Sequence, residues 1–261
     1  MHYVIYFILA VFATTVGSLT GMGGGVIIKP LMDFLGHYDV LTIGVISSVT
    51  VFSMAVVSVM KQIKSGAQIP FKTAIPLAAG SVAGGFIGQK VLELAVDALN
   101  ADSVATIVQN AILAVLIVCV IIYIKNKNHI KGKQLDGIAV SLLVGVFLGF
   151  CSSFLGVGGG PINVALIIFL FSYSTKTATI CSIVIILFAQ VSKLVTNAFT
   201  TGFADFDLSV LPLMVLGAIM GGFIGAELNK KLSEKHVENA FMCVQIFVLA
   251  ITVLNIVKSC F

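Results

Sequence analysis

The chain has 261 residues, of which 59% are hydrophobic and only 10% are charged, and its mean hydropathy is +1.13. Because a soluble domain carries roughly 25% charged residues, this composition excludes an ordinary soluble enzyme or binding domain and indicates an integral membrane protein. The net charge of +4 comes with lysine as the only strongly basic residue type, so it gives no case for nucleic acid as a partner and offers no bidentate guanidinium group for an anion.

The first expected element covers residues 4–35, an apolar stretch that is interrupted at 21–25 by the sequence GMGGG. No positive residues precede its apolar part, so we predict a first membrane segment rather than a cleaved signal peptide. Each glycine costs a helix interior about 1 kcal/mol relative to alanine, and the run therefore predicts a broken helix or a hairpin at 21–25.

The next segments complete a first half of the chain. Residues 40–60 and 104–124 contain no Asp, Glu, Lys or Arg, and each matches the ~20 residues that cross a bilayer as a helix. Between them, residues 80–88 read GSVAGGFIG, a spacing of small residues that is typical of close helix packing. The lysine-rich sequence KNKNHIKGK at 125–133 follows.

The second half begins with residues 137–175, which contain no charged side chain. A straight helix of this length would measure about 58 Å, roughly twice the ~30 Å hydrocarbon core. The glycine pattern returns here as GVGGG at 156–160, followed by Pro161, which suits the first turn of a new helix. We expect a second break at 156–161, a short limb at 161–172, and charge-free membrane segments at 208–226 and 239–257.

The two halves repeat the same elements in the same order. The glycine runs lie 135 residues apart, and residues 80–88 align with 217–225, where GGFIG is identical. We therefore divide the chain into a first membrane repeat at 1–125, a linker at 126–134 and a second membrane repeat at 135–261. The predicted fold class is an all-α integral membrane protein with a broken helix or re-entrant hairpin and about three transmembrane helices in each repeat.

The positions of the lysines predict the orientation, because cytoplasmic loops collect positive charge. The linker at 125–133, which holds four lysines, is predicted to be cytoplasmic. If residues 137–175 crossed the membrane once, the lysines at 230–235 would lie outside, whereas a return within that segment keeps them inside. We therefore predict inverted-topology repeats with both termini outside.

An interrupted helix survives in a bilayer only within protein or beside a wet cavity, since its freed backbone groups need partners. Glycines leave the amides unobstructed, and the helix that begins there carries roughly +0.5 charge at its start. Such a place is suited to an anion, and paired broken helices in inverted repeats usually hold the substrate near the midplane. The candidate glycines are Gly21, Gly23, Gly24, Gly25, Gly156, Gly158, Gly159 and Gly160, with close packing as the alternative.

Polar side chains near these runs extend the candidate site. Lys29 lies four residues past Gly25, and Lys193 shares a helix face with Gln190. A charge inside a membrane marks a functional site, although Lys29 could instead reach the outer face or pair with Asp33. The remaining candidates could equally cap a helix or bond back to a carbonyl of their own helix: Ser18, Thr20, Ser47, Ser152, Ser153, Asn163 and Ser182. For Ser47, Ser48 and Ser182, bonding back is the favoured interpretation.

With these features the chain resembles the TauE/SafE family of sulfite exporters. The resemblance rests on the size, the two halves, GxGGGxxxxP at 21–30 and GVGGGPI at 156–162, and it covers essentially the whole chain. It implies a permease of a prokaryotic inner membrane for a small sulfur-containing anion such as sulfite, sulfoacetate or a related sulfonate. Ala165 stands where the first repeat has Pro30, which suggests different roles for the two hairpins.

A secondary transporter that works by alternating access is the leading hypothesis. A passive anion channel, an intramembrane enzyme and a structural membrane subunit are the alternatives, but the sequence contains neither HExxH nor paired intramembrane Asp, and we predict no catalytic residue. We expect no cofactor, and His and Cys are too sparse for a metal site. The expected partners are the anion and the lipid bilayer. A coupling proton or ion, with Asp33 as the candidate acid, and association into homo-oligomers are left open.

Overall fold

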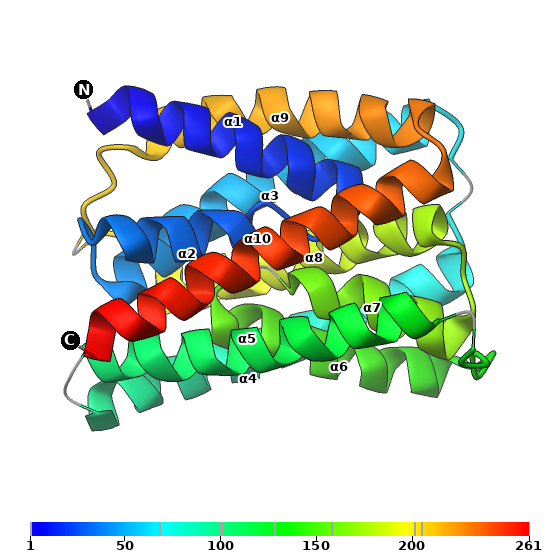
Figure 1. Ribbon diagram of the computed structural model, residues 1–261. Coiled ribbons are helices and arrows are strands. Elements are labelled where there is room, and N and C mark those ends of the chain that lie inside the picture. Colours follow the sequence, from blue (N-terminus) through cyan, green and yellow to red (C-terminus); the bar gives the residue numbers. More distant parts are fainter. Residues whose placement is uncertain are drawn as a thin grey trace.

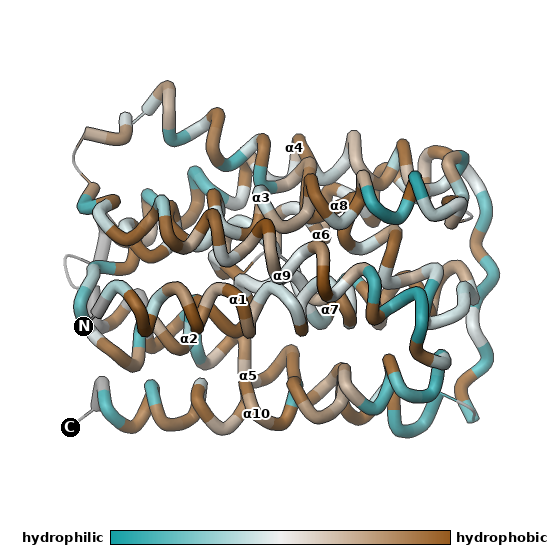
Figure 2. Tube along the Cα trace, turned by 90° about the horizontal axis from the view of Figure 1, so that it is seen from above, coloured by the Kyte–Doolittle hydropathy of each residue, from teal (hydrophilic) through white to brown (hydrophobic). Residues whose placement is uncertain are grey.

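The computed structural model describes residues 2–67, 69–99, 102–127, 129–157, 159–200, 202–204 and 206–260. Over these ranges the chain forms ten α-helices and no strand. The helices lie side by side in one bundle with similar axis directions (Figure 1). Hydrophobic residues occupy the middle of the bundle and hydrophilic residues gather toward its two ends, as Figure 2 shows. This is the distribution that a bilayer imposes.

The two halves of the chain contain corresponding helices of similar length, except that α4 has 29 residues and its counterpart α9 has 21. The first half consists of α1 (His2–Thr20), α2 (Gly25–Leu35), α3 (Val40–Lys64), α4 (Phe71–Leu99) and α5 (Asp102–Asn126). The second half consists of α6 (Ile138–Leu155), α7 (Gly160–Phe171), α8 (Thr175–Phe199), α9 (Leu211–Lys231) and α10 (Glu234–Cys260). Among the described residues, eight of these helices are long and apolar enough to cross a membrane, and α2 and α7 are not among them.

Both predicted breaks are present, because α1 ends at Thr20 before the first glycine run and α6 ends at Leu155 before the second. Gly21, Gly23 and Gly159 have φ of 77°, 72° and 79°, a left-handed conformation that other residues rarely adopt. At each break the chain turns back. The end of α7 lies beside the start of α6, where Leu135 N donates to Leu170 O at 2.7 Å, and α2 likewise returns toward the N-terminus (Figure 1).

The two ends of the bundle differ in charge. Both termini lie at one end, which we call the terminal end, and the linker between α5 and α6 lies at the other (Figure 1). The linker, the ends of α3 and α5, the starts of α4 and α8 and the α9–α10 turn form what we call the lysine-rich end. These segments hold Lys61, Lys64, Lys72, Lys125, Lys127, Lys131, Lys133, Lys176, Lys230, Lys231 and Lys235.

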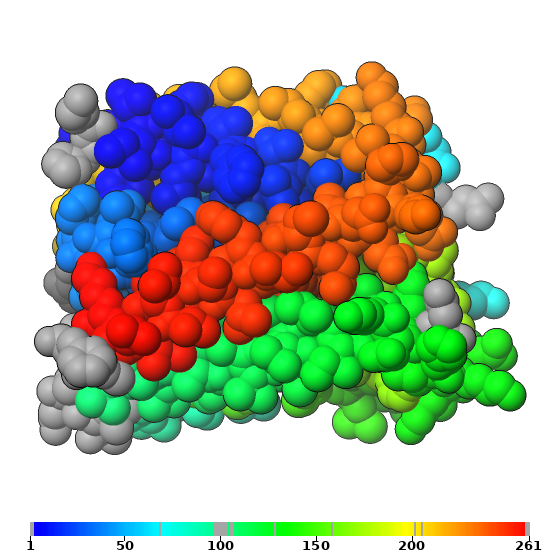
Figure 3. All heavy atoms as spheres, viewed as in Figure 1, coloured from blue at the N-terminus to red at the C-terminus, as the bar shows by residue number. Residues whose placement is uncertain are grey.

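The two GGFIG segments hold pairs of helices in close contact. A Cβ added at Gly84 on α4 would lie 1.9 Å from the carbonyl oxygen of Val146 on α6. In the second half, a Cβ added at Gly225 on α9 would lie 2.2 Å from the carbonyl oxygen of Thr15 on α1. Backbones approach this closely only where side chains are absent, as the spacing of small residues indicated. Helix α10 crosses obliquely between the first hairpin and α5 (Figure 3), where Asn255 Nδ2 donates to Pro30 O at 2.8 Å.

Replacing Gly84 by leucine should separate α4 from α6, because the new side chain would meet backbone that cannot move aside. Overpacking of this kind costs about 1–3 kcal/mol, sometimes more. The measurement is thermal unfolding of the purified protein in detergent, with Ala83→Leu as the matched control, since Ala83 is exposed on the same helix. A melting temperature for Gly84→Leu equal to that of Ala83→Leu would contradict the packing role.

Candidate functional site

The two glycine breaks meet at the centre of the bundle. A Cβ added at Gly25 would lie 2.7 Å from the carbonyl oxygen of Val157, and one added at Gly160 would lie 2.9 Å from that of Met22. Both breaks are buried. From this meeting point α2 runs toward the terminal end and α7 toward the lysine-rich end (Figure 1). The N-termini of the two short helices, with their partial positive charges, therefore lie close together in the interior.

Several backbone amides at these N-termini have no acceptor among the described residues. The hydrogen bonds of the described residues include none from the N–H groups of Gly25, Val26 or Gly160, and all three residues are buried. Buried N–H groups without a partner are rare in folded proteins. Amides left free at a helix N-terminus are the groups that bind anions elsewhere. Gly158, the remaining glycine of the predicted set, lies outside the described residues.

Lys29 and Lys193 lie on either side of Gly156. A Cβ added at Gly156 would be 3.2 Å from Lys29 Cδ and 3.8 Å from Lys193 Nζ, so the two predicted lysines reach the same glycine loop from α2 and α8. Lys29 is 3% exposed, and its Nζ pairs with the Asp33 carboxylate at 3.3 Å. The predicted alternative for Lys29, a pair with Asp33, is thus present, and it neutralises this lysine.

Lys193 differs from Lys29 because its ammonium group has no hydrogen-bond partner. The residue is 1% exposed. Lys29 repels this ammonium group, and Glu93 on α4 attracts it at longer range, but the Glu93 carboxylate accepts a bond from Gln89 instead. A buried charge without a partner is strongly unfavourable, by several kcal/mol. Lys193 is therefore a buried cationic group for which the described residues supply no hydrogen-bond partner.

Other predicted residues around the second break also lack partners. They are buried polar side chains from α6, α7 and α8, and a bound molecule would satisfy them where the protein does not. The atoms are the hydroxyls of Ser152 and Ser153, both polar atoms of the Asn163 amide and Oε1 of Gln190. Asn163 lies against the loop, since its Nδ2 is 2.7 Å from the Cβ position of Gly159.

Of the predicted hydroxyls around the first break, those of Ser18 and Thr20 have partners within the protein. Ser18 Oγ lies 2.7 Å from Ser58 Oγ and donates to Gly222 O at 3.1 Å. Thr20 donates back to Val16 O, as a helix hydroxyl commonly does. Ser47 lies against the loop, with Oγ 3.1 Å from the Cβ position of Gly25. The polar groups left for a ligand are thus concentrated at the second break.

Ser182 corrects one expectation from the sequence. Ser48 bonds back to its own helix, to Gly44 O at 2.6 Å, but Ser182 donates to Gly21 O in the first loop at 2.6 Å. Thr179, one turn earlier on α8, also reaches this loop: its hydroxyl bonds back to Thr175 O at 2.8 Å and lies 3.3 Å from Thr20 O, so the two carbonyls share one donor. The break frees the loop carbonyls, and donors from α8 satisfy them. Thr179 was missed, although it lies on the same helix face as Ser182.

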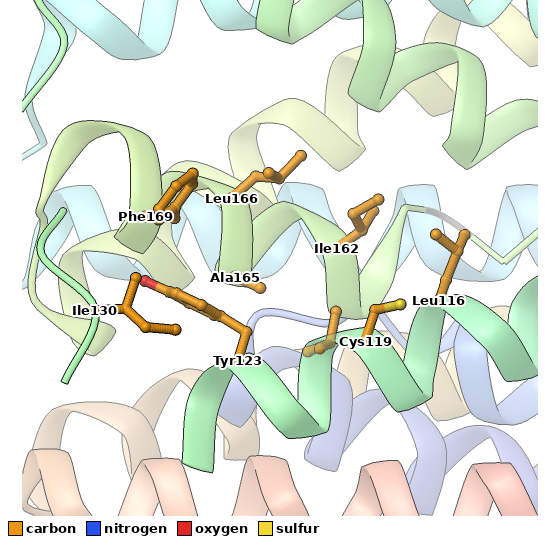
Figure 4. Close-up of a pocket in the computed structure, with 9 residues that line it drawn as sticks. Leu116, Cys119, Tyr123, Ile130, Ile162, Ala165, Leu166 and Phe169 are labelled. Carbon is orange, nitrogen blue, oxygen red and sulfur yellow. The ribbon is translucent and has the colours of Figure 1, made fainter. Parts of the chain in front are cut away.

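The outer surface holds a groove of a different kind. It lies between α5 and α7, has a volume of about 400 Å³, and is lined by apolar side chains that face one another in Figure 4. Its lining residues are Leu116, Cys119, Val120, Tyr123, Ile130, Ile162, Ala165, Leu166 and Phe169. Because none of them carries a charge or an amide side chain, this groove is unsuited to an anion.

Comparisons with known proteins agree on one class. The sequence profile of the family described as "Sulfite exporter TauE/SafE" matches residues 6–252. The probable membrane transporter protein YunE of Bacillus subtilis is 27% identical over 91% of this chain and 92% of its own length. A probable membrane transporter protein of Methanocaldococcus jannaschii is 24% identical over 84% of each chain. No solved structure matches the chain significantly.

Replacing Ser182 by alanine should destabilise the protein, because it leaves the buried carbonyl of Gly21 without its donor. A buried group that loses its partner costs about 1–3 kcal/mol. Ser48→Ala is the matched control, since its hydroxyl bonds only within its own helix and its loss should cost little. The two melting temperatures in detergent are compared, and a drop for Ser182→Ala no larger than for Ser48→Ala would refute the role of this bond.

Proposed function

We propose that this chain, which belongs to the sulfite exporter TauE/SafE family, is a secondary transporter that binds a small anion between its two glycine breaks. The family and the relatives identify a multi-pass membrane transporter rather than an enzyme. The finer proposal is a sulfur oxyanion or sulfonate, such as sulfite or sulfoacetate. The main support for this site is that the buried ammonium group of Lys193 has no hydrogen-bond partner among the described residues and lies beside the loop at Gly156.

The proposed binding mode combines one point charge with several hydrogen-bond donors. Lys193 supplies the charge, and the free amides at the starts of α2 and α7 supply donors that also carry the positive ends of the helix dipoles. The hydroxyls of Ser152 and Ser153 and the amide of Asn163 add donors from the second half. Lys29 is neutralised by Asp33, so the charges in direct contact with the loops sum to one positive charge. A monovalent oxyanion matches this charge.

The proposed architecture is two inverted-topology repeats at 1–125 and 135–261, joined by a linker at 126–134. The opposite directions of α2 and α7 support it (Figure 1). Because positive loops face the cytoplasm, we assign the lysine-rich end to the cytoplasm and both termini to the outside. Transport then follows from rocking of one repeat against the other around the site.

A carrier accounts for the centre of the bundle better than a passive channel does. The two breaks are in contact through their backbones, with Gly25 against Val157 and Gly160 against Met22. Rotation of a side chain alone would therefore not open a path. An ion could pass only after the two halves move relative to each other. This requirement is typical of alternating access rather than of a continuous pore.

Replacing Lys193 by methionine should weaken sulfite binding, and with it transport at low sulfite concentration, without harming the fold. Loss of one charge-assisted contact costs about 1.5–3 kcal/mol, which corresponds to about tenfold or more in affinity. Removing an unpaired buried charge relieves its desolvation, so the melting temperature should stay the same or rise. The measurements are sulfite uptake into proteoliposomes and thermal unfolding in detergent.

Lys29→Met provides the contrast. This substitution leaves the Asp33 carboxylate, whose side chain is only 2% exposed, without its ion-pair partner. It should therefore lower the melting temperature. Lys235→Met, at the lysine-rich end, controls for the change of net charge. Sulfite uptake by Lys193→Met at the wild-type rate and affinity would remove Lys193 from the site. If the wild-type protein moves none of sulfite, sulfoacetate or thiosulfate, with or without a proton gradient, the proposed substrate class is wrong.

A further inference from the structure

A second group of polar side chains lies away from the glycine breaks, in a cavity at the lysine-rich end. We call this cavity the lysine vestibule. It has a volume of about 200 Å³ and lies between α3, α8 and α9. Its lining residues are Gln62, Ser65, Ala67, Lys176, Ile180, Ala226, Asn229 and Lys230. A volume of this size holds a small anion with a few water molecules.

Gln62 indicates that the vestibule is built for a ligand. The residue is only 4% exposed, and both polar atoms of its side-chain amide have no hydrogen-bond partner among the described residues. A buried amide group is unfavourable unless something bonds to it. A leucine of similar size would fill the same space without that penalty. The side-chain amide nitrogen of glutamine, Nε2, can donate hydrogen bonds to an oxyanion.

The charge of the vestibule is positive. Lys176 on α8 and Lys230 on α9 both line it, and Lys176 Nζ donates to the carbonyl oxygen of Lys230 at 3.4 Å. Neither lysine forms an ion pair in the described structure. Lys61 and Lys231 do, because both pair with Glu227, at 2.9 and 3.2 Å. The lysines that line the vestibule are therefore among those at this end that form no ion pair in the described structure.

The vestibule is connected to the end of α1, just before the first glycine break, through the lining residue Asn229 and through Thr179, which precedes the lining residue Ile180. Asn229 Nδ2 donates to Leu19 O at 2.7 Å, and Thr179, the neighbour of Ile180, donates to Thr20 O. The carbonyl end of a helix is partially negative and would repel an anion. Because these carbonyls already accept bonds from α8 and α9, their negative charge is partly offset at the point where an anion would pass.

The cavity at the opposite end has a different character. It has a volume of about 330 Å³ and is lined by Tyr3, Tyr6, His37, Tyr38, Asp207, Ser209 and Val210. It contains no lysine, and it contains one carboxylate. An anion is therefore attracted more strongly to the lysine-rich end than to the terminal end.

We propose that the lysine vestibule is a second anion-binding site, which captures the substrate oxyanion at the lysine-rich end before it reaches the glycine breaks. The proposal rests on the transport function proposed above. It assigns binding to Lys176, Lys230 and Gln62, none of which touches the central site. Because its lysines are partly exposed to water, the vestibule binds more weakly than the centre and acts mainly by raising the local concentration of the anion.

The test is the concentration dependence of sulfite transport in inside-out and right-side-out membrane vesicles. In one orientation sulfite is added at the lysine-rich end, and in the other at the terminal end. Lys230→Gln and Lys176→Gln should raise KM about three- to tenfold when sulfite is added at the lysine-rich end, and should leave KM at the terminal end and the maximal rate unchanged. Added inert salt should shrink the difference from the wild-type protein.

Lys231→Gln is the matched control, because it makes the same change of charge one residue away on a lysine that is paired with Glu227. Gln62→Leu should raise KM at the lysine-rich end while keeping or raising the melting temperature, which a purely structural glutamine would not do. Equal KM values for Lys230→Gln and Lys231→Gln at that end would overturn the vestibule, as would an equal shift at both ends. A wild-type protein without sulfite flux would instead refute the transport function.

Discussion

The interruption of two helices inside the bilayer is the constraint on which the rest of this structure depends. Each break frees carbonyls at the end of one helix and amides at the start of the next, and lipid satisfies neither. At the first break the freed carbonyls of Leu19, Thr20 and Gly21 accept bonds from Asn229, Thr179 and Ser182 in the second half of the chain. The amides have no such partners. The protein thus stabilises the freed carbonyls itself, and the amides are the groups to which the proposed anion would bind.

The 135-residue offset between the glycine runs also shows why the two breaks are chemically unequal. It pairs Ser18 with Ser153 and Ser58 with Lys193. In the first half Ser18 and Ser58 bond to each other and to Gly222 O, which closes that location. In the second half neither Ser153 Oγ nor Lys193 Nζ has a partner. The same arrangement of helices therefore holds a hydrogen-bonded pair of hydroxyls in the first half, and a hydroxyl and an ammonium group without partners at the equivalent positions of the second half.

The sequence was sufficient for the features that local chemistry decides. Consecutive glycines predicted both breaks, the length of residues 137–175 predicted a return, and the i, i+4 spacing of Lys29 and Asp33 offered their ion pair. Features that depend on which distant segments meet were not predictable in this way. The bond from Ser182 to Gly21 requires α8 to lie against the end of α1, and the isolation of Lys193 depends on the Glu93 carboxylate of the neighbouring α4 accepting a bond from Gln89 rather than from the lysine. The offset that aligns Ser47 with Ser182 also aligns Gly44 with Thr179, and could have directed attention to both positions.

An unpaired lysine at the centre also bears on how transport couples to binding. In the proposed carrier, any rearrangement of the empty protein must move an uncompensated positive charge through an apolar interior, which is costly. A bound monovalent anion cancels that charge, so the loaded protein changes conformation more readily than the empty one. A ligand drives a conformational change only through such a difference in interaction free energy between states. Selectivity follows from the same balance, because a neutral molecule would leave the charge of Lys193 in place.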